Sequence, residues 1–121
     1  MSVLKLYTLE NCSTCREAVS WLRGRGGKFS VHPIRTNPPT VPELERLLAA
    51  YGGERRKLFN TAGRDYRAQG IAARQAEMSD AEALRLLAGN GSLMKRPVLL
   101  GPGVALVGFS AATWAEAVPL A

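Results

Sequence analysis

The chain has 121 residues, which is enough for one compact domain and too few for two. Hydrophobic residues make up 46% of it and charged residues 21%, a globular composition that excludes intrinsic disorder. No apolar run reaches the roughly 18 residues of a membrane-spanning helix. The first residues also lack the basic, apolar and small-residue regions of a signal peptide. We therefore expect a cytoplasmic protein that makes no membrane contact.

The net charge of +6 fits an anionic small substrate, an acidic protein partner or nucleic acid. The basic residues are spread along the chain, and their densest clusters carry no interleaved aromatic residues of the kind that stack on single strands. We therefore interpret the charge as a solvated basic surface and expect no direct binding of nucleic acid.

The first third of the chain predicts a strand, a helix and a second strand. Alternation over residues 3–8 is typical of a strand. Apolar positions then recur with helical spacing from Ser13 until Gly24, where a glycine-rich stretch ends the helix. Residues 28–35 resemble a second, short strand. The side chains expected to be buried there are Phe29, Val31 and Ile34.

The middle of the chain, approximately residues 40–92, predicts a helical insert. Thr40 with Glu43, and Ser79 with Glu82, each have the form of a capping box, so we expect a helix to begin at both places. The sequence between these two helices predicts short helices and turns. The apolar residues expected to anchor them are Leu58, Phe59, Tyr66 and Ile71.

The end of the chain predicts a hairpin and a last helix. Residues 97–100 and 104–109 have the composition of two strands joined by a glycine-rich turn, and Ser110 is placed to cap the final helix. A βαβ start and a ββα finish around a helical insert is the thioredoxin-like plan. We therefore expect a single α/β domain over residues 1–121, with a mixed sheet.

The two cysteines stand close together, in Cys12-Ser13-Thr14-Cys15. One such pair is not the disulfide framework of an extracellular scaffold. With His32 as the only histidine, the chain also lacks the usual ligands of structural zinc, so we expect no metal. A C-x-x-C motif between a strand and a helix predicts redox chemistry. The alternative is a pair of buried small side chains without a redox role.

Cys12 falls where the N-cap of the first helix is expected. Unpaired backbone N–H groups and the helix dipole favour a thiolate there, and Arg16 adds positive charge, so Cys12 is the predicted nucleophile. Cys15 lies one turn further along the same face, from which it can form a disulfide with Cys12 and resolve an adduct. Asn11 is predicted either to hydrogen-bond the loop of the nucleophile or to shape the turn.

Arg96-Pro97 directly precedes the predicted third strand. Thioredoxin-like folds carry a cis-proline at this place beside the reactive cysteine, and X-Pro bonds are those for which the cis form costs little. With Pro97 in that role, Arg96 is held near Cys12, where its planar guanidinium suits an oxyanion. The alternative is an ordinary trans proline with an arginine at the surface.

Four segments, in order along the chain, carry a resemblance to a known family. They are Leu6-Tyr7-Thr8 with Asn11-Cys12-Ser13-Thr14-Cys15-Arg16, Leu58-Phe59-Asn60-Thr61 with Gly63-Arg64 and Tyr66, Leu93-Met94-Lys95-Arg96-Pro97-Val98-Leu99, and Leu106-Val107-Gly108-Phe109-Ser110. On these residues the chain resembles the ArsC-like family. That family includes arsenate reductases, Spx/MgsR-type regulators that bind RNA polymerase, and YffB-type proteins.

For the glutaredoxin-coupled arsenate reductases, the resemblance implies a nucleophilic cysteine at the position of Cys12 and three arginines that bind the oxyanion. Arg96 matches the arginine that precedes proline. The second expected arginine falls on Asn60, with Arg56 and Arg64 nearby, and the third has no counterpart in residues 108–110. The expected substrate-binding residues are Arg96, Arg16, Asn60 and Arg64.

The resemblance thus predicts a thiol-dependent arsenate reductase without a bound cofactor. Cys12 attacks arsenate, Cys15 resolves the adduct, and thioredoxin or glutaredoxin reduces the disulfide between them. One alternative is an Spx/MgsR-type regulator, which uses the disulfide as a switch and binds the α subunit of RNA polymerase. Another is a glutathione-dependent thiol reductase of the YffB type.

Overall fold

Strands and helices alternate at both ends of the chain, and the middle is helical, in the computed structural model that describes residues 3–118. The βαβ start, the helical insert and the ββα finish expected from the sequence are confirmed. In chain order the elements are β1 (Leu4–Thr8), α1 (Ser13–Gly24), β2 (Phe29–Pro33), α2 (Val41–Ala50), the 3-10 helix η1 (Arg55–Leu58), α3 (Arg64–Ala68), α4 (Ile71–Gln75), α5 (Asp80–Gly89), the 3-10 helix η2 (Gly91–Leu93), β3 (Val98–Gly101), β4 (Val104–Val107) and α6 (Ala111–Ala117). None of the helices between residues 3 and 118 has the length and apolar character needed to span a bilayer.

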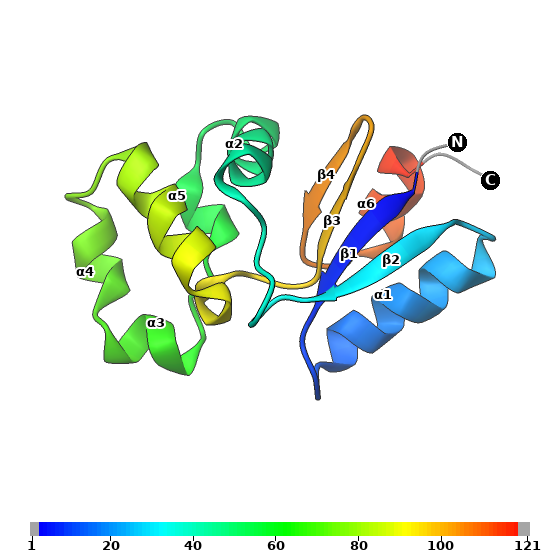
Figure 1. The fold of residues 1–121 in the computed structure, drawn as a ribbon, viewed down its shortest axis with the longest axis horizontal. Coiled ribbons are helices and arrows are strands. Elements are labelled where there is room, and N and C mark those ends of the chain that lie inside the picture. The colour runs from blue at the N-terminus through cyan, green and yellow to red at the C-terminus, as the bar shows by residue number, and fades with distance from the viewer. Residues whose placement is uncertain (1–2, 119–121) are drawn as a thin grey trace.

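The strands form one mixed sheet in the order β2-β1-β3-β4 (Figure 1). β1 runs parallel to β2 and antiparallel to β3, and β4 is antiparallel to β3. The C-terminal ends of β1 and β2 therefore lie at the same edge of the sheet as the N-terminal end of β3. This edge brings together the residues that follow β1, those that follow β2 and those that precede β3.

Each face of the sheet has its own core. Leu6 and Leu99 point to the face covered by α1 and α6, where Trp114 packs with them. Tyr7 and Val98 point to the opposite face, against residues 41–93, which we call the helical lobe. Figure 1 shows the lobe on one side of the sheet, and α1 and α6 on the other. This is the thioredoxin-like α/β fold, with the lobe as its insert.

Side-chain caps decide where the longer helices begin. Thr40 and Glu43 form a complete capping box at the start of α2, and Ser79 and Glu82 form another at the start of α5. In each box the hydroxyl accepts from a backbone N–H while the carboxylate accepts from the N-cap backbone, so free helix-end donors are satisfied. Both boxes confirm the sequence prediction.

The capping box of α2 also ties the helical lobe to the sheet. The Glu43 carboxylate accepts hydrogen bonds from Lys5 Nζ at 2.7 Å and from Tyr7 Oη at 2.8 Å, both on β1. Burial by itself would raise the pKa of Glu43, but the hydrogen bonds from Lys5, the Thr40 backbone and Tyr7 outweigh it and lower that pKa. The ionised carboxylate therefore links β1 to α2.

Two expectations about the strands need correction. Val31 was expected to be buried, yet its side chain is 50% exposed, because β2 is an edge strand with a neighbour on one side only. Phe29 is half-buried and Ile34 fully buried, as expected. The last strand ends at Val107 rather than at residue 109, since Gly108 turns the chain with a φ of +72°.

Gly91 permits a close approach between η2 and the chain after β2. A Cβ on Gly91 would overlap the carbonyl group of Ile34, which is backbone and has no alternative rotamer. We predict that Gly91→Ala lowers the free energy of unfolding by roughly 1–3 kcal/mol, as overpacking of a buried site does, measured by urea denaturation. The matched control is Gly89→Ala, because a Cβ on Gly89 would meet no other atom within 4 Å. Equal losses in the two variants would contradict the steric explanation.

Candidate active site

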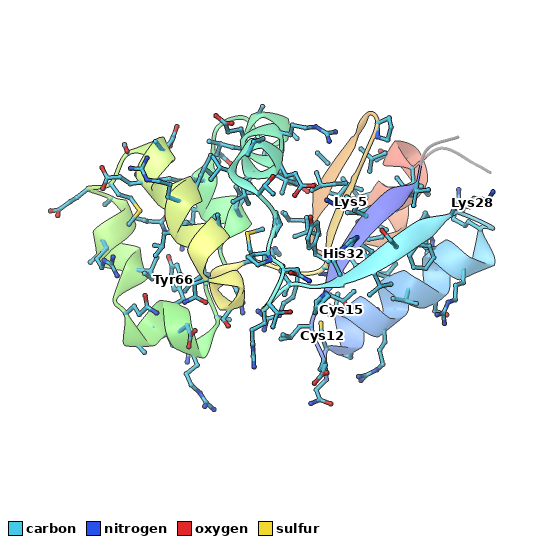
Figure 2. All side chains as sticks on the ribbon, viewed as in Figure 1. Lys5, Cys12, Cys15, Lys28, His32 and Tyr66 are labelled. Atoms are coloured by element: carbon cyan, nitrogen blue, oxygen red, sulfur yellow. The ribbon has the colours of Figure 1, made fainter. Side chains whose placement is uncertain are left out.

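The cysteine motif lies where β1 passes into α1, at the edge of the sheet described above (Figure 2). Cys12 is the N-cap of α1 and is half-buried, whereas Cys15, in the first turn, is only 2% exposed. Asn11 precedes them with a φ of 59°, in the left-handed region that asparagine adopts more readily than most residues. Asn11 therefore shapes the turn that presents Cys12, one of its two predicted roles.

Cys12 sits in the environment of a nucleophilic thiol. Its Sγ accepts a hydrogen bond from the backbone N–H of Cys15 at 3.2 Å. The sulfur thus lies at the N-terminus of α1, where a backbone N–H points toward it. Half-burial keeps the sulfur reachable for a substrate, so the position fits the attacking role predicted from the sequence.

Cys15 has the opposite character. Its burial, followed by a hydrogen bond with the Cys12 side chain, raises the pKa of Cys15 to about 12, although the backbone at Leu9 and the charge of Arg96 act to lower it. Cys15 thus stays a thiol at neutral pH. Both cysteines are free in this structure. One half-buried sulfur at the helix N-terminus and one shielded thiol beside it form the kind of pair that nucleophilic attack and resolution require.

The peptide bond between Arg96 and Pro97 is cis, which confirms the prediction made from its place before the third strand. The Arg96 Nη1 group donates to the carbonyls of Ser92 at 3.4 Å and Met94 at 3.3 Å. Within the described chain these contacts use Nη1 alone, so Nη2 and Nε remain for an anion. Arg96 is also near enough for its charge to act on Cys15.

A short antiparallel pairing between residues 58–60 and 93–95 places Asn60 opposite Leu93, three residues before Arg96. The Asn60 N–H donates to the carbonyl of Leu93 at 2.7 Å. The central residues of the two segments form an isolated β-bridge. The helical lobe is thereby joined to the chain just before the cis peptide bond.

Three of the four predicted substrate-binding residues line one open pocket of about 540 Å³: Asn60, Arg64 and Arg96. Arg35, from the loop after β2, adds a third guanidinium, and Asp65 contributes one carboxylate. We call this the arginine pocket. Its complete lining is Arg35, Asn60, Gly63, Arg64, Asp65, Ser92 and Arg96. Gly63 matters to its shape, because a Cβ there would come 2.7 Å from Asn60 Nδ2.

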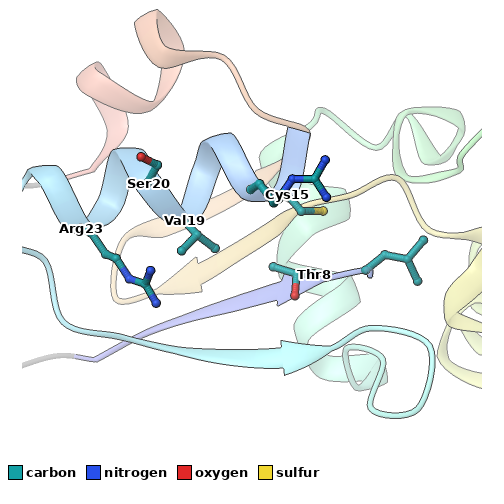
Figure 3. A pocket seen from close by; sticks show the side chains of 7 residues that line it. Thr8, Cys15, Val19, Ser20 and Arg23 are labelled. Atoms are coloured by element: carbon teal, nitrogen blue, oxygen red, sulfur yellow. The ribbon is translucent and has the colours of Figure 1, made fainter. Parts of the chain in front are cut away.

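Arg16 lies elsewhere. It is exposed on α1 and lines a different pocket of about 380 Å³, beside Cys15 (Figure 3). We call this the α1 pocket. It is lined by Thr8, Leu9, Cys15, Arg16, Val19, Ser20 and Arg23. The structure therefore does not bring Arg16 together with the other three residues, and a role of Arg16 in substrate binding stays a prediction.

Arg35 was missed in the sequence, where it is only the last residue of the expected second strand. The signal that points to it is topological. Because β2 is parallel to β1, the residue that follows β2 lies at the same edge as the residues that follow β1, including Cys12. That inference needs the strand pairing, which periodicity along one chain does not reveal.

Comparisons with known proteins find similar sequences and similar structures. The model of the ArsC family matches residues 7–117. The uncharacterized protein YusI of Bacillus subtilis is 37% identical over 106 residues, which cover 88% of this chain and 90% of YusI. A solved structure described as a possible arsenate reductase from Streptococcus mutans is 35% identical with a TM-score of 0.82, covering 90% of this chain and 92% of that one. The global transcriptional regulator Spx of Streptococcus agalactiae is 27% identical over 108 residues, 89% of this chain and 77% of Spx.

The unequal environments of the two thiols predict selective alkylation. At neutral pH, iodoacetamide should modify Cys12 and spare Cys15, because Cys15 is buried and its thiol resists ionisation until the pH nears 12. Intact-mass spectrometry should show one adduct on the native protein, none on Cys12→Ser and one on Cys15→Ser. Two adducts on the protein unfolded in urea would serve as the control. Labelling of Cys15 in the folded protein at neutral pH would contradict the assignment.

Proposed function

From the premise that this chain belongs to the ArsC family, we propose that it is a thiol-dependent arsenate reductase. The observation that carries the proposal is the cysteine pair at the α1 N-terminus, with an accessible Cys12 and a shielded Cys15. The arginine pocket, which includes Arg96 beside the cis peptide bond, supports an oxyanion as the substrate. The solved structure described as a possible arsenate reductase points to the same activity.

In this proposal the arginine pocket binds arsenate although two of the family's expected arginines are absent. Arg96 presents its guanidinium from the segment before β3, and Arg35 and Arg64 supply the remaining positive charge. Guanidinium groups suit tetrahedral oxyanions because their N–H donors are planar and paired. Asn60 contributes an amide donor, while Asp65 offsets part of the charge and disfavours a more highly charged anion.

The proposed chemistry balances with two thiols. The Cys12 thiolate attacks arsenic(V), an As–S bond forms and water leaves. Cys15 Sγ then attacks Cys12 Sγ, giving its proton to an arsenic oxygen; the S–S bond forms, the As–S electron pair stays on arsenic and arsenite departs. A thioredoxin or a glutaredoxin reduces the Cys12–Cys15 disulfide by thiol–disulfide exchange. No cofactor bound to this chain takes part.

A second candidate function is that of an Spx-type regulator. The observation that favours it is the 27% sequence identity to Spx of Streptococcus agalactiae. In that case the disulfide between Cys12 and Cys15 biases a conformation, and the basic surface meets the α subunit of RNA polymerase. Retention of the α subunit by the immobilised chain, changed by oxidation and accompanied by no turnover of arsenate, would decide for the regulator.

The reductase proposal predicts NADPH consumption that depends on both cysteines. With arsenate, thioredoxin and thioredoxin reductase, the native chain should turn over; Cys12→Ser should abolish the activity because the nucleophile is gone. Cys15→Ser should also abolish it in this system, yet keep the alkylation of Cys12 intact. A parallel assay with glutathione, glutaredoxin and glutathione reductase identifies the donor. Absence of turnover with both donors would overturn the enzyme proposal, and glutathione-dependent reduction of a disulfide without arsenate turnover would replace it by a thiol reductase.

The arginine pocket predicts a loss that falls on substrate binding. Arg35→Gln and Arg64→Gln should each raise KM for arsenate by roughly tenfold or more, as expected when a charge-assisted hydrogen bond is lost, with a smaller effect on kcat. Arg74→Gln is the matched control, since Arg74 is an exposed arginine on α4 that lies outside the pocket. An unchanged KM in both pocket variants would remove Arg35 and Arg64 from the site.

A further inference from the structure

The α1 pocket gives Cys15 a second environment that the proposed reaction does not use. Cys15 faces Cys12 on one side and lines this pocket on the other. Figure 3 shows Cys15, Val19 and Arg23 projecting from α1 toward the space above β1, with Thr8 rising from the strand below. The pocket of about 380 Å³ falls within the range of small-ligand sites.

The α1 pocket and the arginine pocket are separate. They have no lining residue in common, and they belong to different parts of the fold. The α1 pocket lies between α1 and the end of β1, while the arginine pocket is built mainly from the helical lobe and the chain before β3. A ligand of the α1 pocket therefore need not compete with an oxyanion beside Arg96.

The lining of the α1 pocket combines positive charge with an apolar surface. Arg16 and Arg23 stand two turns apart on one face of α1, about 10 Å along the axis. Between them, Val19 and Leu9 are half-buried and apolar. Ser20 adds a hydroxyl at the rim, and within the described chain no carboxylate lines the pocket. A ligand that matches this pattern carries one anionic group and a short apolar body.

We propose that the α1 pocket binds a small amphiphilic carboxylate, with the carboxylate at Arg23 and the apolar part packed on Val19 against Cys15. Arg23 is preferred as the anion partner because Val19, one turn before it, puts an apolar side chain next to the Arg23 guanidinium. Burial of the apolar part supplies the hydrophobic share of the affinity, and the guanidinium–carboxylate pair fixes the orientation.

Such a ligand would also slow the recycling of the disulfide, a consequence that rests on the proposed function. When a reductant thiolate attacks Cys12 Sγ, a new S–S bond forms to the reductant and the Cys12–Cys15 bond breaks. Its electron pair goes to Cys15 Sγ, which leaves as a thiolate. Because Cys15 is already buried, an apolar body in the α1 pocket acts by keeping water from reaching the sulfur as the disulfide opens, and a desolvated thiolate is a poorer leaving group.

Octanoate is the probe for the binding site. In a titration of the reduced full chain followed by ¹H–¹⁵N correlation spectra, we expect saturable shifts centred on Thr8, Val19 and Arg23. Octanol, which lacks the charge, and acetate, which lacks the chain, should each bind roughly tenfold more weakly or worse. Arg23→Gln should weaken octanoate by a similar factor, and Arg74→Gln should not.

Several outcomes would overturn the site. These are shifts that do not saturate, shifts centred on Asn60 and Arg96 in the arginine pocket, equal binding of octanoate and octanol, or equal losses in Arg23→Gln and Arg74→Gln. Shifts that do not saturate indicate that there is no site, and shifts centred on Asn60 and Arg96 indicate that octanoate binds in the arginine pocket. Equal binding of octanol, or equal losses in the two variants, indicates an apolar association without the predicted charge recognition.

The effect on recycling is measured separately, as the rate at which dithiothreitol reduces the oxidised chain. Saturating octanoate should slow this reduction several-fold in the native chain and leave Arg23→Gln unaffected. An unchanged rate under saturation would overturn the effect while the binding site stands. A chain that forms no Cys12–Cys15 disulfide would overturn the proposed function instead, and the binding titration would still decide the site.

Discussion

The hydrogen bonds that β1 makes to both of its neighbours decide where the chemistry of this protein can occur. Parallel pairing with β2 and antiparallel pairing with β3 bring two strand ends and one strand start to a single edge of the sheet. Cys12, Arg35 and Arg96 each lie within a few residues of that edge, although they are far apart along the chain. The sheet pairing brings the Cys12 loop, the loop that carries Arg35 and the cis peptide bond to the same end of the sheet.

The helical lobe completes the site and is held in place at two points. The Glu43 carboxylate joins the start of α2 to β1, and the pairing of residues 58–60 with 93–95 joins the lobe to the chain before β3. The second contact places Asn60 opposite Leu93, in the segment that leads to the cis peptide bond. An insert fastened in this way acts as one wall of the arginine pocket. Its polar residues Asn60, Arg64 and Asp65 line that pocket, whose lining includes neither cysteine.

The two cysteines differ because they occupy different positions at the start of α1. Cys12, at the N-cap, receives a backbone N–H and remains half-buried. Cys15, one turn later, is buried against the sheet, and this burial raises its pKa. Cys15 also lines the α1 pocket, which shares no lining residue with the arginine pocket. The shielded thiol is thus the point at which an oxyanion reaction on one side and a ligand on the other would meet.

Local signals in the sequence were sufficient to predict many of the helix boundaries and turns of this protein. The boundaries of α1, both capping boxes and the hairpin follow from residue types and spacings, because helix ends and turns depend on a few neighbouring residues. The cis bond before Pro97 followed instead from the thioredoxin-like plan, in which a cis-proline precedes the third strand. The tertiary structure decided the rest. It exposed Val31 by placing β2 at the edge, separated Arg16 from the arginine pocket, and brought Arg35 into it. These outcomes depend on which strands pair and on which side a helix packs, and long-range contacts of that kind leave no periodic trace along a single chain.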